Sequence, residues 1–269
     1  AFLDEGIVPA LTIGLFFVAD EETSGGKGLY HVLDLPEKLF SEDDLIVVPD
    51  SGKPDGSLIE IAEKSILWLQ FKTTGKQCHG SKPQLGNNAF SAASYLVTQL
   101  AKLRKIFDAF DPLFDPPVCT FEPTKKETNV DNINTIPGED VFYMDCRILP
   151  QYHLVDVMTA IENIAHKVEK KFSVRIEISP KQHVQSPAPT PANAPVVIAL
   201  QEAITKVYAV KAYAGGVGAG TVAAYLRKRN FPVAVWSKLN MNAHQPDENC
   251  TIDNMVNNAK VFARLFLKE

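Results

Sequence analysis

The apolar positions of the chain follow two patterns, and each predicts a different kind of sheet. Residues 11–19 (LTIGLFFVA) and 45–48 are apolar on both faces and rich in β-forming residues, which is typical of strands buried between helices in a parallel sheet. Residues 66–73, 118–121 and 141–149 instead alternate apolar and polar positions, as half-buried antiparallel strands do. The chain is therefore expected to combine an α/β part with an α+β part.

Helices and a proline-rich connector complete the predicted order of elements. Residues 88–106 and 155–172 carry apolar side chains three and four positions apart, which predicts two amphipathic helices on one face of the antiparallel sheet. Four prolines between positions 187 and 195 then form a stiff connector. The elements predicted after it are helices at 196–207, 222–229 and 252–267, a glycine-rich turn at 215–220 and a strand at 233–236.

This order predicts a discontinuous domain with an insert. The first domain has the α/β fold class, with helices on both faces of a mixed sheet, and comprises residues 1–64 and 186–269. The inserted α+β domain comprises residues 65–185. Open α/β sheets bind their ligands beyond the carboxyl ends of the strands. Side chains that follow the predicted strands of the first domain are therefore the candidates for chemistry.

Composition and charge argue against several classes of function. With 45% hydrophobic and 22% charged residues, the chain resembles globular proteins, and its net charge of −5 without a long cationic run is unsuited to nucleic-acid binding. The apolar runs are shorter than the ~20 residues that span a bilayer, and the start, AFLDEGIVPA, does not have the form of a secretory signal. The four cysteines are far apart and read as reduced thiols. We expect a cytoplasmic protein with small-molecule partners, bound to neither membrane nor nucleic acid.

Two adjacent glutamates directly follow the first predicted strand. At the mouth of a buried strand Glu21 and Glu22 would repel each other, and burial would raise their pKa values, so a bound cation would relieve both costs. One carboxylate could hold the metal ion while its neighbour acts as a general base toward water. The alternative is a solvated acidic turn at the start of the next helix.

A carboxylate and an imidazole follow two other predicted strands. Asp50, in VVPDSG, comes after residues 45–48, and His244, in NMNAHQPDE, lies in the polar loop after residues 233–236. Taken singly, Asp50 is typical of a turn and His244 of a structural or exposed histidine. Together with Glu22, however, they follow strands of one inferred sheet, and carboxylate and imidazole ligands together suit Zn²⁺ and similar ions.

Five motifs give a resemblance to a known family. In order along the chain they are FFVADEETSGG, VVPDSG, GKQCHGSKPQLGNNAFSAA, NTIPGEDVFYMDCRILP and AHQPDENC. This set resembles the M20 family of metallopeptidases and acylamino-acid deacylases over nearly the whole chain. The resemblance implies a zinc-peptidase-like catalytic domain and an inserted, ferredoxin-like lid or dimerisation domain, through which a homodimer forms.

The resemblance also implies roles for the acidic candidates and the histidine that follow the strands. It makes Glu21 the general base. It implies that Glu22, Asp50 and His244 are ligands of a centre of two divalent ions, Zn²⁺ or Co²⁺, in the intact protein. These roles agree with the chemistry argued above from the residues themselves.

A second group of residues is implied to bind the substrate. His79 and Asn134 are implied to lie on the insert and to hold the substrate carbonyl or carboxylate. A hydrogen-bond donor at that place would stabilise a tetrahedral oxyanion. In the dimer, His79 is implied to reach the neighbouring subunit's site. Arg147 resembles the family's carboxylate-binding arginine, and Gly220 and Thr221 lie in the glycine-rich turn beside that carboxylate. The alternatives are an exposed loop for His79, an ion pair with an acidic residue of its own strand for Arg147, and a plain tight turn.

Two residues of the implied metal centre have no counterpart in the chain. The family places a histidine of an HxD motif and a bridging aspartate upstream of the glutamate pair, but only 20 residues precede Glu21 and the first histidine is His31. A bridging carboxylate holds two cations close together and shares their charge. We therefore expect this chain to be a fragment that is inactive by itself, binds at most one metal ion weakly and exposes an apolar flank.

For the intact protein we expect hydrolysis of the amide bond of an N-acylated amino acid. The strings GTVAAYLRK and AHQPDENC most resemble the branch that acts on N-succinyl-diaminopimelate or N-acetylornithine. One alternative is a carboxypeptidase or dipeptidase of the same family. The other is a metal-free dimerisation or binding protein, in which the strand at 66–73, if it lies at a sheet edge, pairs between subunits.

Overall fold

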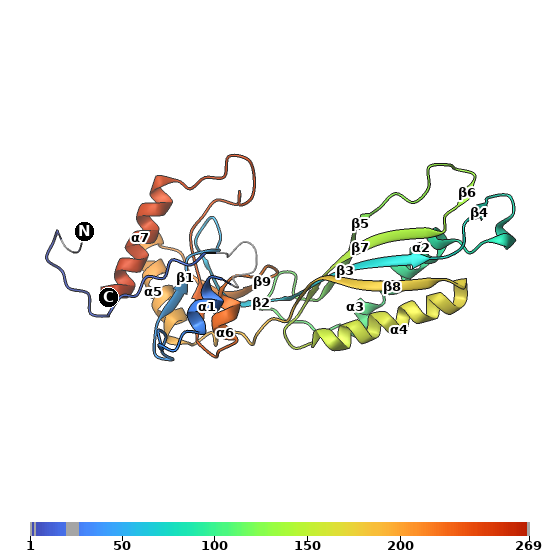
Figure 1. The fold of residues 1–269 in the computed structure, drawn as a ribbon. Coiled ribbons are helices and arrows are strands. Elements are labelled where there is room, and N and C mark those ends of the chain that lie inside the picture. Colours follow the sequence, from blue (N-terminus) through green and yellow to red (C-terminus); the bar gives the residue numbers. More distant parts are fainter. Residues whose placement is uncertain (1, 3, 20–26, 268–269) are drawn as a thin grey trace. The chain divides into compact units, whose positions relative to one another are not determined.

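The structure, a computed structural model, describes residues 2, 4–19 and 27–267 (Figure 1). The chain divides into two compact units. Unit 1 comprises residues 1–63 and 187–269, and unit 2 comprises residues 64–186. Each unit has its own sheet, covered by its own helices.

Unit 1 is built on a mixed four-stranded sheet in the order β1-β10-β2-β9. Its strands are β1 (Ile46–Val48), β2 (Leu58–Glu63), β9 (Tyr213–Val217) and β10 (Val233–Val235). β1 is parallel to β10, β10 is antiparallel to β2, and β2 is parallel to β9. The two central strands, β10 and β2, are buried along their whole length, as strands covered on both faces are.

Helices cover both faces of this sheet. The helices described in unit 1 are α1 (Leu29–Leu33), α5 (Pro195–Tyr208), α6 (Ala223–Arg227) and α7 (Ile252–Leu267). α1 and α6 pack on the face that carries Val233 and Val235. On the opposite face, Trp236 contacts Tyr208 of α5 and Phe262 of α7. The predicted α/β fold class, a mixed sheet with helices on both faces, is confirmed.

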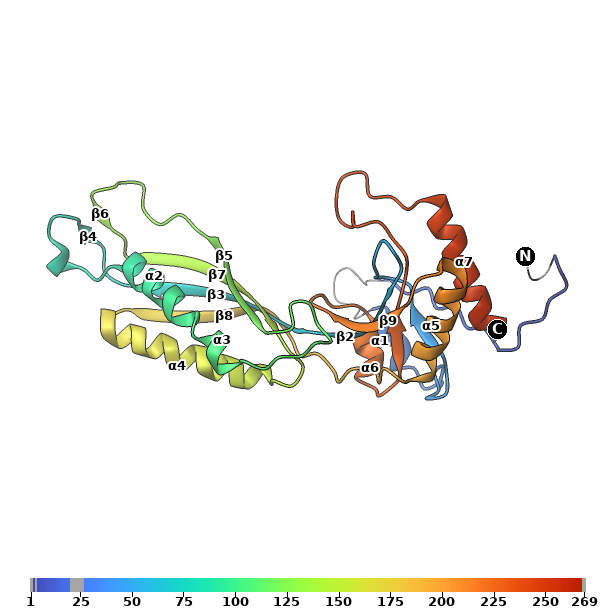
Figure 2. The ribbon, with the colours of Figure 1, turned by 180° about the vertical axis from the view of Figure 1, so that it is seen from behind.

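Unit 2 is an antiparallel four-stranded sheet in the order β5-β7-β3-β8. Its strands are β3 (Ser65–Thr74), β5 (Thr120–Lys126), β7 (Glu139–Ile148) and β8 (Arg175–Val184), and its helices are α2 (Ala89–Leu100), α3 (Leu103–Ile106) and α4 (Leu154–Phe172). The βαββαβ order is the ferredoxin-like arrangement. Figure 2 shows the helices on one face of the sheet, where alternate side chains of β3 are buried and Phe71 stacks on Phe142 at 4.6 Å.

The predicted strand at residues 11–19 is wrong. Residues 12–18 have no regular secondary structure, and Leu15 and Phe17 are 72% and 93% exposed. An apolar strand is stable only where neighbouring strands take up its N–H and C=O groups. Among the described residues, β1 pairs with β10 and with no other strand, so residues 12–18 do not extend the sheet.

Other predictions differ in detail because local chemistry overrides the apolar pattern. The helix expected at 88–106 divides into α2 and α3, since Lys102 N–H bonds back to Gln99 O at 3.0 Å and ends the first helix. The first part of the expected glycine turn, residues 215–217, belongs to β9. Two strands, β2 and β8, were not expected from the apolar pattern, because charged residues interrupt it in both.

β3, predicted to pair between subunits if it lay at an edge, lies in the middle of its sheet. It has β7 on one side and β8 on the other, and the edges are β5 and β8. That form of the metal-free dimer hypothesis is therefore wrong. Among the helices of the described residues, none is both long enough and apolar enough to cross a lipid bilayer.

Candidate active site

The chain segments that leave β1 and β10 run side by side. Trp236 N–H donates to Val48 O at 3.0 Å, and Ser237 N–H donates to Ser51 O at 2.8 Å. A Cβ atom on Gly52 would fall 1.8 Å from Ser237 O, so glycine is required for this close approach. The parallel pairing thus brings the turn that carries Asp50 and the start of the loop that carries His244 to the same end of the sheet.

Asp50 and His244 are both exposed beyond this end of the sheet. His244 has a left-handed backbone (φ 58°), and its N–H donates to Glu248 Oε2 at 2.9 Å. The loop is closed by a bond from Asn240 Nδ2 to Asn249 Oδ1 at 3.0 Å. A carboxylate and an imidazole that follow neighbouring strands are a donor set that fits a divalent ion.

The glutamate pair lies outside the described residues. Glu21 and Glu22 fall in the range 20–26, so their predicted roles as general base and metal ligand stay predictions. Within residues 2, 4–19 and 27–267, no three His, Cys, Asp or Glu side chains gather into a metal site. Of the predicted ligands, the described part of the chain therefore supplies Asp50 and His244.

Asn258 of α7 fixes the start of the loop that leads to His244. Its Oδ1 accepts from Tyr208 Oη at 2.8 Å and from Lys238 N–H at 3.3 Å. Its Nδ2 donates to Ser237 Oγ and Lys238 O, both at 3.0 Å. One amide therefore ties the strand exit to two helices, a role that no sequence pattern indicated.

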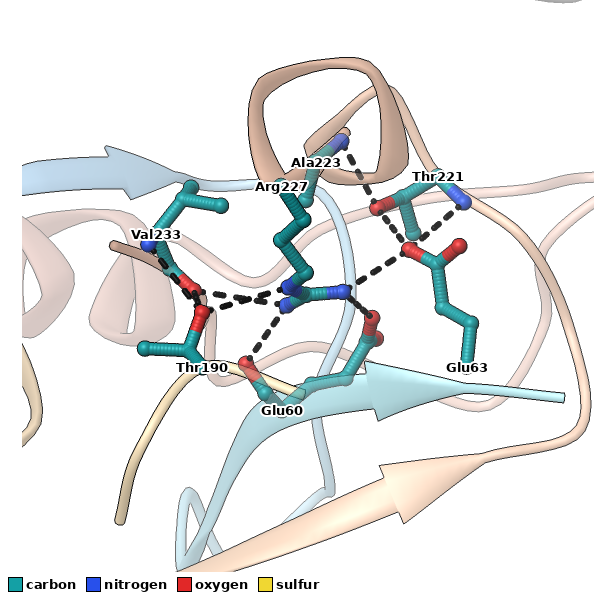
Figure 3. A network of polar contacts seen from close by, with 7 residues as sticks. All are labelled: Glu60, Glu63, Thr190, Thr221, Ala223, Arg227 and Val233. Atoms are coloured by element: carbon teal, nitrogen blue, oxygen red, sulfur yellow. Dashed lines mark hydrogen bonds and ion pairs between the residues drawn. The ribbon is translucent and has the colours of Figure 1, made fainter. Parts of the chain in front are cut away.

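Thr221, predicted to bind the substrate carboxylate, is bonded inside the protein. Its N–H and its hydroxyl donate to Glu63 Oε1 at 3.2 and 2.9 Å, and its Oγ1 accepts from Ala223 N–H at 3.1 Å (Figure 3). Gly220 precedes it at an exposed position. These bonds hold the start of α6, as in the tight-turn alternative, and the anion-binding role of Gly220 and Thr221 stays a prediction.

A buried charged cluster surrounds Glu63 (Figure 3). Arg227 Nη1 lies 3.1 Å from Glu63 Oε1 and 3.7 Å from Glu60 Oε1, and all three side chains are at most 3% exposed. Arg227 Nη2 also donates to Glu60 O at 3.2 Å and to Val233 O at 3.4 Å, and Nε donates to Thr190 Oγ1 at 3.4 Å. One guanidinium thus contacts two carboxyl groups and donates hydrogen bonds to β2, to β10 and to the loop that carries Thr190.

Burial is the main electrostatic influence on this cluster. It raises the pKa of Glu60 to about 9, with further upward contributions from Glu63 and Asp50, against the opposing charge of Arg227. Burial also raises the pKa of Glu63, while Arg227 and Thr221 act to lower it. Neither carboxyl oxygen of Glu60 has a hydrogen-bond partner among the described residues. A pKa of about 9 keeps Glu60 protonated at neutral pH, next to the Glu63 carboxyl group that accepts hydrogen bonds from Arg227 and Thr221.

This cluster could not be predicted from the pattern of residues, because it depends on a β-bulge. Residues three apart on a regular strand point to opposite faces. In β2 the register shifts between Glu60 and Ala62, so Glu60 and Glu63 both reach Arg227.

His79 and Asn134, predicted to bind the substrate, are brought together in unit 2. β4 (Cys78–His79) pairs with β6 (Thr135–Ile136), and His79 lies opposite Thr135. Gly80 N–H donates to Asn134 O at 2.6 Å, and the His79 imidazole is held by Ser81 Oγ, 2.8 Å from Nδ1. Figure 1 shows this two-stranded ribbon beyond the ends of β3 and β7. Two residues 55 positions apart in the chain thus share one small ribbon.

Arg147 lies on the face of the unit 2 sheet that the helices leave open. Its Nε and Nη2 donate to the two carboxylate oxygens of Asp145 at 2.7 and 2.9 Å, and its guanidinium lies 5.7 Å from the ring centre of Trp68. The ion pair within its own strand, the alternative named for this residue, is therefore present. A carboxylate-binding role stays a prediction.

Similarity to known families supports the resemblance seen in the motifs. The family profile described as a peptidase dimerisation domain of the M20 type matches residues 61–173. A sequence described as an uncharacterized metallohydrolase of Methanococcus maripaludis is 41% identical over 96% of this chain and 66% of its own length. A succinyl-diaminopimelate desuccinylase of a Wolbachia strain is 23% identical over 91% of the chain and 59% of its own length. The chain thus spans about two thirds or less of these curated relatives.

Solved structures share the fold. A tripeptidase from Staphylococcus aureus superposes with a TM-score of 0.73 at 15% identity, over 93% of this chain and 62% of the tripeptidase. The aminopeptidase PepT from Bacillus cereus gives 0.72, with the same identity and coverage. These identities support the fold alone. The family is shown by the dimerisation-domain profile, the metallohydrolase relatives and the motif set together: the chain belongs to the M20 family of metallopeptidases and deacylases.

Proposed function

We propose that the whole protein is a metal-dependent hydrolase of amide bonds. Its substrate would be an N-acylated amino acid or small peptide with a free carboxylate. The observation that carries this proposal is the parallel pairing of β1 with β10, which directs Asp50 and the His244 loop to one end of a sheet. Family membership supports the same reaction class, as do the names of the metallohydrolase and desuccinylase relatives.

The metal centre is proposed to use Glu22, Asp50 and His244 as ligands. A bound Zn²⁺ or Co²⁺ would polarise the scissile carbonyl and make water acidic enough to deprotonate near neutral pH. Glu21 would take the proton from water and pass it to the leaving amine, which needs a carboxylate that is free of the metal. Asp50 and His244 sit at exposed positions that an ion in solution can reach.

Substrate binding is proposed to use the ribbon of unit 2 and the open face of its sheet. His79 and Asn134 would donate hydrogen bonds to the carbonyl oxygen as negative charge develops on it. Ser81, bonded to Nδ1, fixes the orientation of the His79 ring. Arg147 would bind the substrate carboxylate, and to do so it would share or exchange the Asp145 carboxylate that it contacts.

The proposed assembly is a homodimer formed through unit 2. The profile that matches residues 61–173 is that of a peptidase dimerisation domain. Unit 2 also has two sheet edges, β5 and β8, and among the described residues no further strand pairs with either of them, so a strand of another chain could add there. Light scattering coupled to size-exclusion chromatography on wild-type protein should give twice the mass of one chain; a monomer at micromolar concentration would contradict this assembly.

Metal binding and hydrolysis test the proposed function directly. Zn²⁺ and Co²⁺ titrations of the whole protein by calorimetry should show tight binding that Asp50→Asn and His244→Asn each weaken at least 10-fold. The matched controls, Asp43→Asn and His31→Asn, change exposed residues of unit 1 and should bind as wild type does. Equal metal affinity in all variants would refute the ligand assignment.

A substrate panel then separates the enzyme classes. N-succinyl-diaminopimelate, N-acetylornithine and a set of di- and tripeptides should be offered to the metal-loaded protein. Turnover of the acylated amino acids above the peptides supports a deacylase, and the reverse preference supports the peptidase alternative. No turnover of either class by a metal-loaded protein would refute the proposed reaction.

A further inference from the structure

The segment that carries Asn134 leaves the sheet of unit 2 and returns to it. β5 ends at Lys126 and β7 begins at Glu139, so residues 127–138, called here the tip segment, form an excursion between neighbouring strands. The tip segment contains β6, which pairs with β4, and Asn134 O accepts the bond from Gly80 N–H. The position of Asn134 relative to His79 therefore depends on how the tip segment is held at its base.

A buried carboxylate lies at that base. The Asp140 side chain is fully buried, and Lys126 Nζ lies 2.5 Å from each of its oxygens. Asn129 Nδ2 donates to Asp140 Oδ2 at 2.9 Å. Lys126 Nζ also lies 4.7 Å from the ring centre of Phe90 in α2, which fixes the ammonium from another side. Asp140, at the returning end of the tip segment, thus binds two residues at its outgoing end.

The two legs of the tip segment are fastened differently. The returning leg has backbone bonds to the rest of unit 2: Gly75 N–H donates to Gly138 O at 2.7 Å, and Ala89 N–H donates to Pro137 O at 3.1 Å. Within the described part of the chain, the outgoing leg has one such bond, from Glu127 N–H to Val141 O at 3.0 Å. From there its course is held by side chains, with Asn129 bonded to Asp140. A carboxylate without its cation is costly to keep buried, so Asp140 and Lys126 hold each other in place.

From this geometry we propose that Asp140 and Lys126 form a clamp that positions Asn134 for substrate. The proposal rests on the proposed function for its catalytic consequence, and on the contacts of unit 2 alone for its structural consequence. Asp140 and Lys126 are positioning residues, because they act through Asn134.

Hydrogen exchange tests the structural consequence without any need for activity. In Asp140→Asn and Lys126→Met, the amides of Gly80 and Thr135 should exchange at least 10-fold faster than in wild type, while the central amides of β3 and β7 keep their protection. Lys126→Arg retains the ion pair and should keep the wild-type rates. The matched control is Glu139→Gln, on the same strand as Asp140. It removes an exposed ion pair with Lys72 of β3 and should leave the tip segment unchanged. Unchanged exchange at Gly80 and Thr135 in Asp140→Asn would overturn the clamp.

A double-mutant cycle tests the catalytic consequence. Asp140→Asn should lower kcat/KM about 10-fold, and it should do so through the same parameter as Asn134→Ala, either a lower kcat or a higher KM. The double variant should be no worse than Asn134→Ala, because a residue that acts through Asn134 has nothing left to position. Additive losses would overturn the positioning role. If wild-type protein hydrolyses none of the substrates, the proposed function fails while the exchange experiment still decides on the clamp.

Discussion

Replacing Glu60 with glutamine should stabilise the protein at neutral pH. The isosteric amide cannot ionise, and it fills the same buried space beside Glu63 and Arg227. The wild-type carboxyl group is protonated in the folded chain, where its pKa is about 9, and ionised in the unfolded chain, where its value is 4.5. The unfolded state therefore gains free energy from ionisation that the folded state cannot match, and Glu60→Gln removes this gain.

The magnitude follows from the two pKa values. Between pH 4.5 and about 9 the folded state binds one proton more than the unfolded state, so the free energy of unfolding falls by about 1.4 kcal/mol per pH unit on account of this group. At pH 7 the accumulated loss is about 3 kcal/mol. The raised pKa of Glu63 adds a loss of the same sign. The glutamine variant should therefore gain about 3 kcal/mol at pH 7 and very little near pH 4.5.

Urea unfolding followed by the fluorescence of Trp236, at pH values from 5 to 8.5 and with Trp68 replaced by phenylalanine in every variant, measures this difference. Trp236 is fully buried in unit 1, so its emission follows the unit that contains Glu60. The control Glu202→Gln changes an exposed residue of α5 and should match wild type at every pH. A Glu60→Gln variant that is less stable than wild type by the same amount at every pH would refute the reasoning, since it would mean that Glu60 is ionised in the folded protein.

Three further substitutions test other parts of the structure. Gly52→Ala places a methyl group against Ser237 O, so it should lower the free energy of unfolding by roughly 1–3 kcal/mol and weaken metal binding. In the control Gly218→Ala the added methyl group meets open space, and neither quantity should change. Wild-type stability of Gly52→Ala would contradict the close approach of the strand exits. Arg227→Met leaves two buried carboxyl groups without their cation and should cost roughly 3–5 kcal/mol, more at pH 8 than at pH 5, in chemical denaturation. Asp145→Asn removes the carboxylate that pairs with the Arg147 guanidinium, so it should lower KM for substrates with a free carboxylate. The free energy of unfolding should change by less than about 1 kcal/mol. An unchanged KM would contradict the assignment of Arg147 as the carboxylate-binding group.

The parts of the fold that follow regular patterns could be predicted from the sequence. The alternation of residues 66–73 and 141–149 gave β3 and β7, and helical spacing gave α4 and α7 within one or two residues. The apolar run at 11–19 looked the same as a buried strand, yet it forms none, because burial also requires neighbours that composition does not reveal. Regular spacing thus identifies which face of an element is apolar, but not whether another element covers it.

Parts of the candidate site were predictable for a different reason. Asp50 and His244 were chosen because they follow buried strands, and the parallel pairing of β1 with β10 places the turn and the loop at one end of the sheet. His79 and Asn134 came from the resemblance, since nothing in their spacing shows that β4 and β6 pair. Asn258 could not be found, because an asparagine on an amphipathic helix is typical of a solvated face.

The charged groups that could not be predicted from the sequence depend either on irregular backbone or on pairing between residues far apart in the chain. Glu60 and Glu63 meet Arg227 only because β2 bulges between them, and Asp140 meets Lys126 across neighbouring strands, 14 residues apart. A buried charge requires its partner nearby, so each such pair restricts the backbone on both sides more tightly than apolar contacts of the same size. In unit 1 the buried charges fix the start of α6, and in unit 2 they fix the base of the tip segment. The charged groups that periodic spacing does not reveal are thus the ones that hold the irregular segments in place. Asp50 and His244, at the strand ends, remain accessible to ligands.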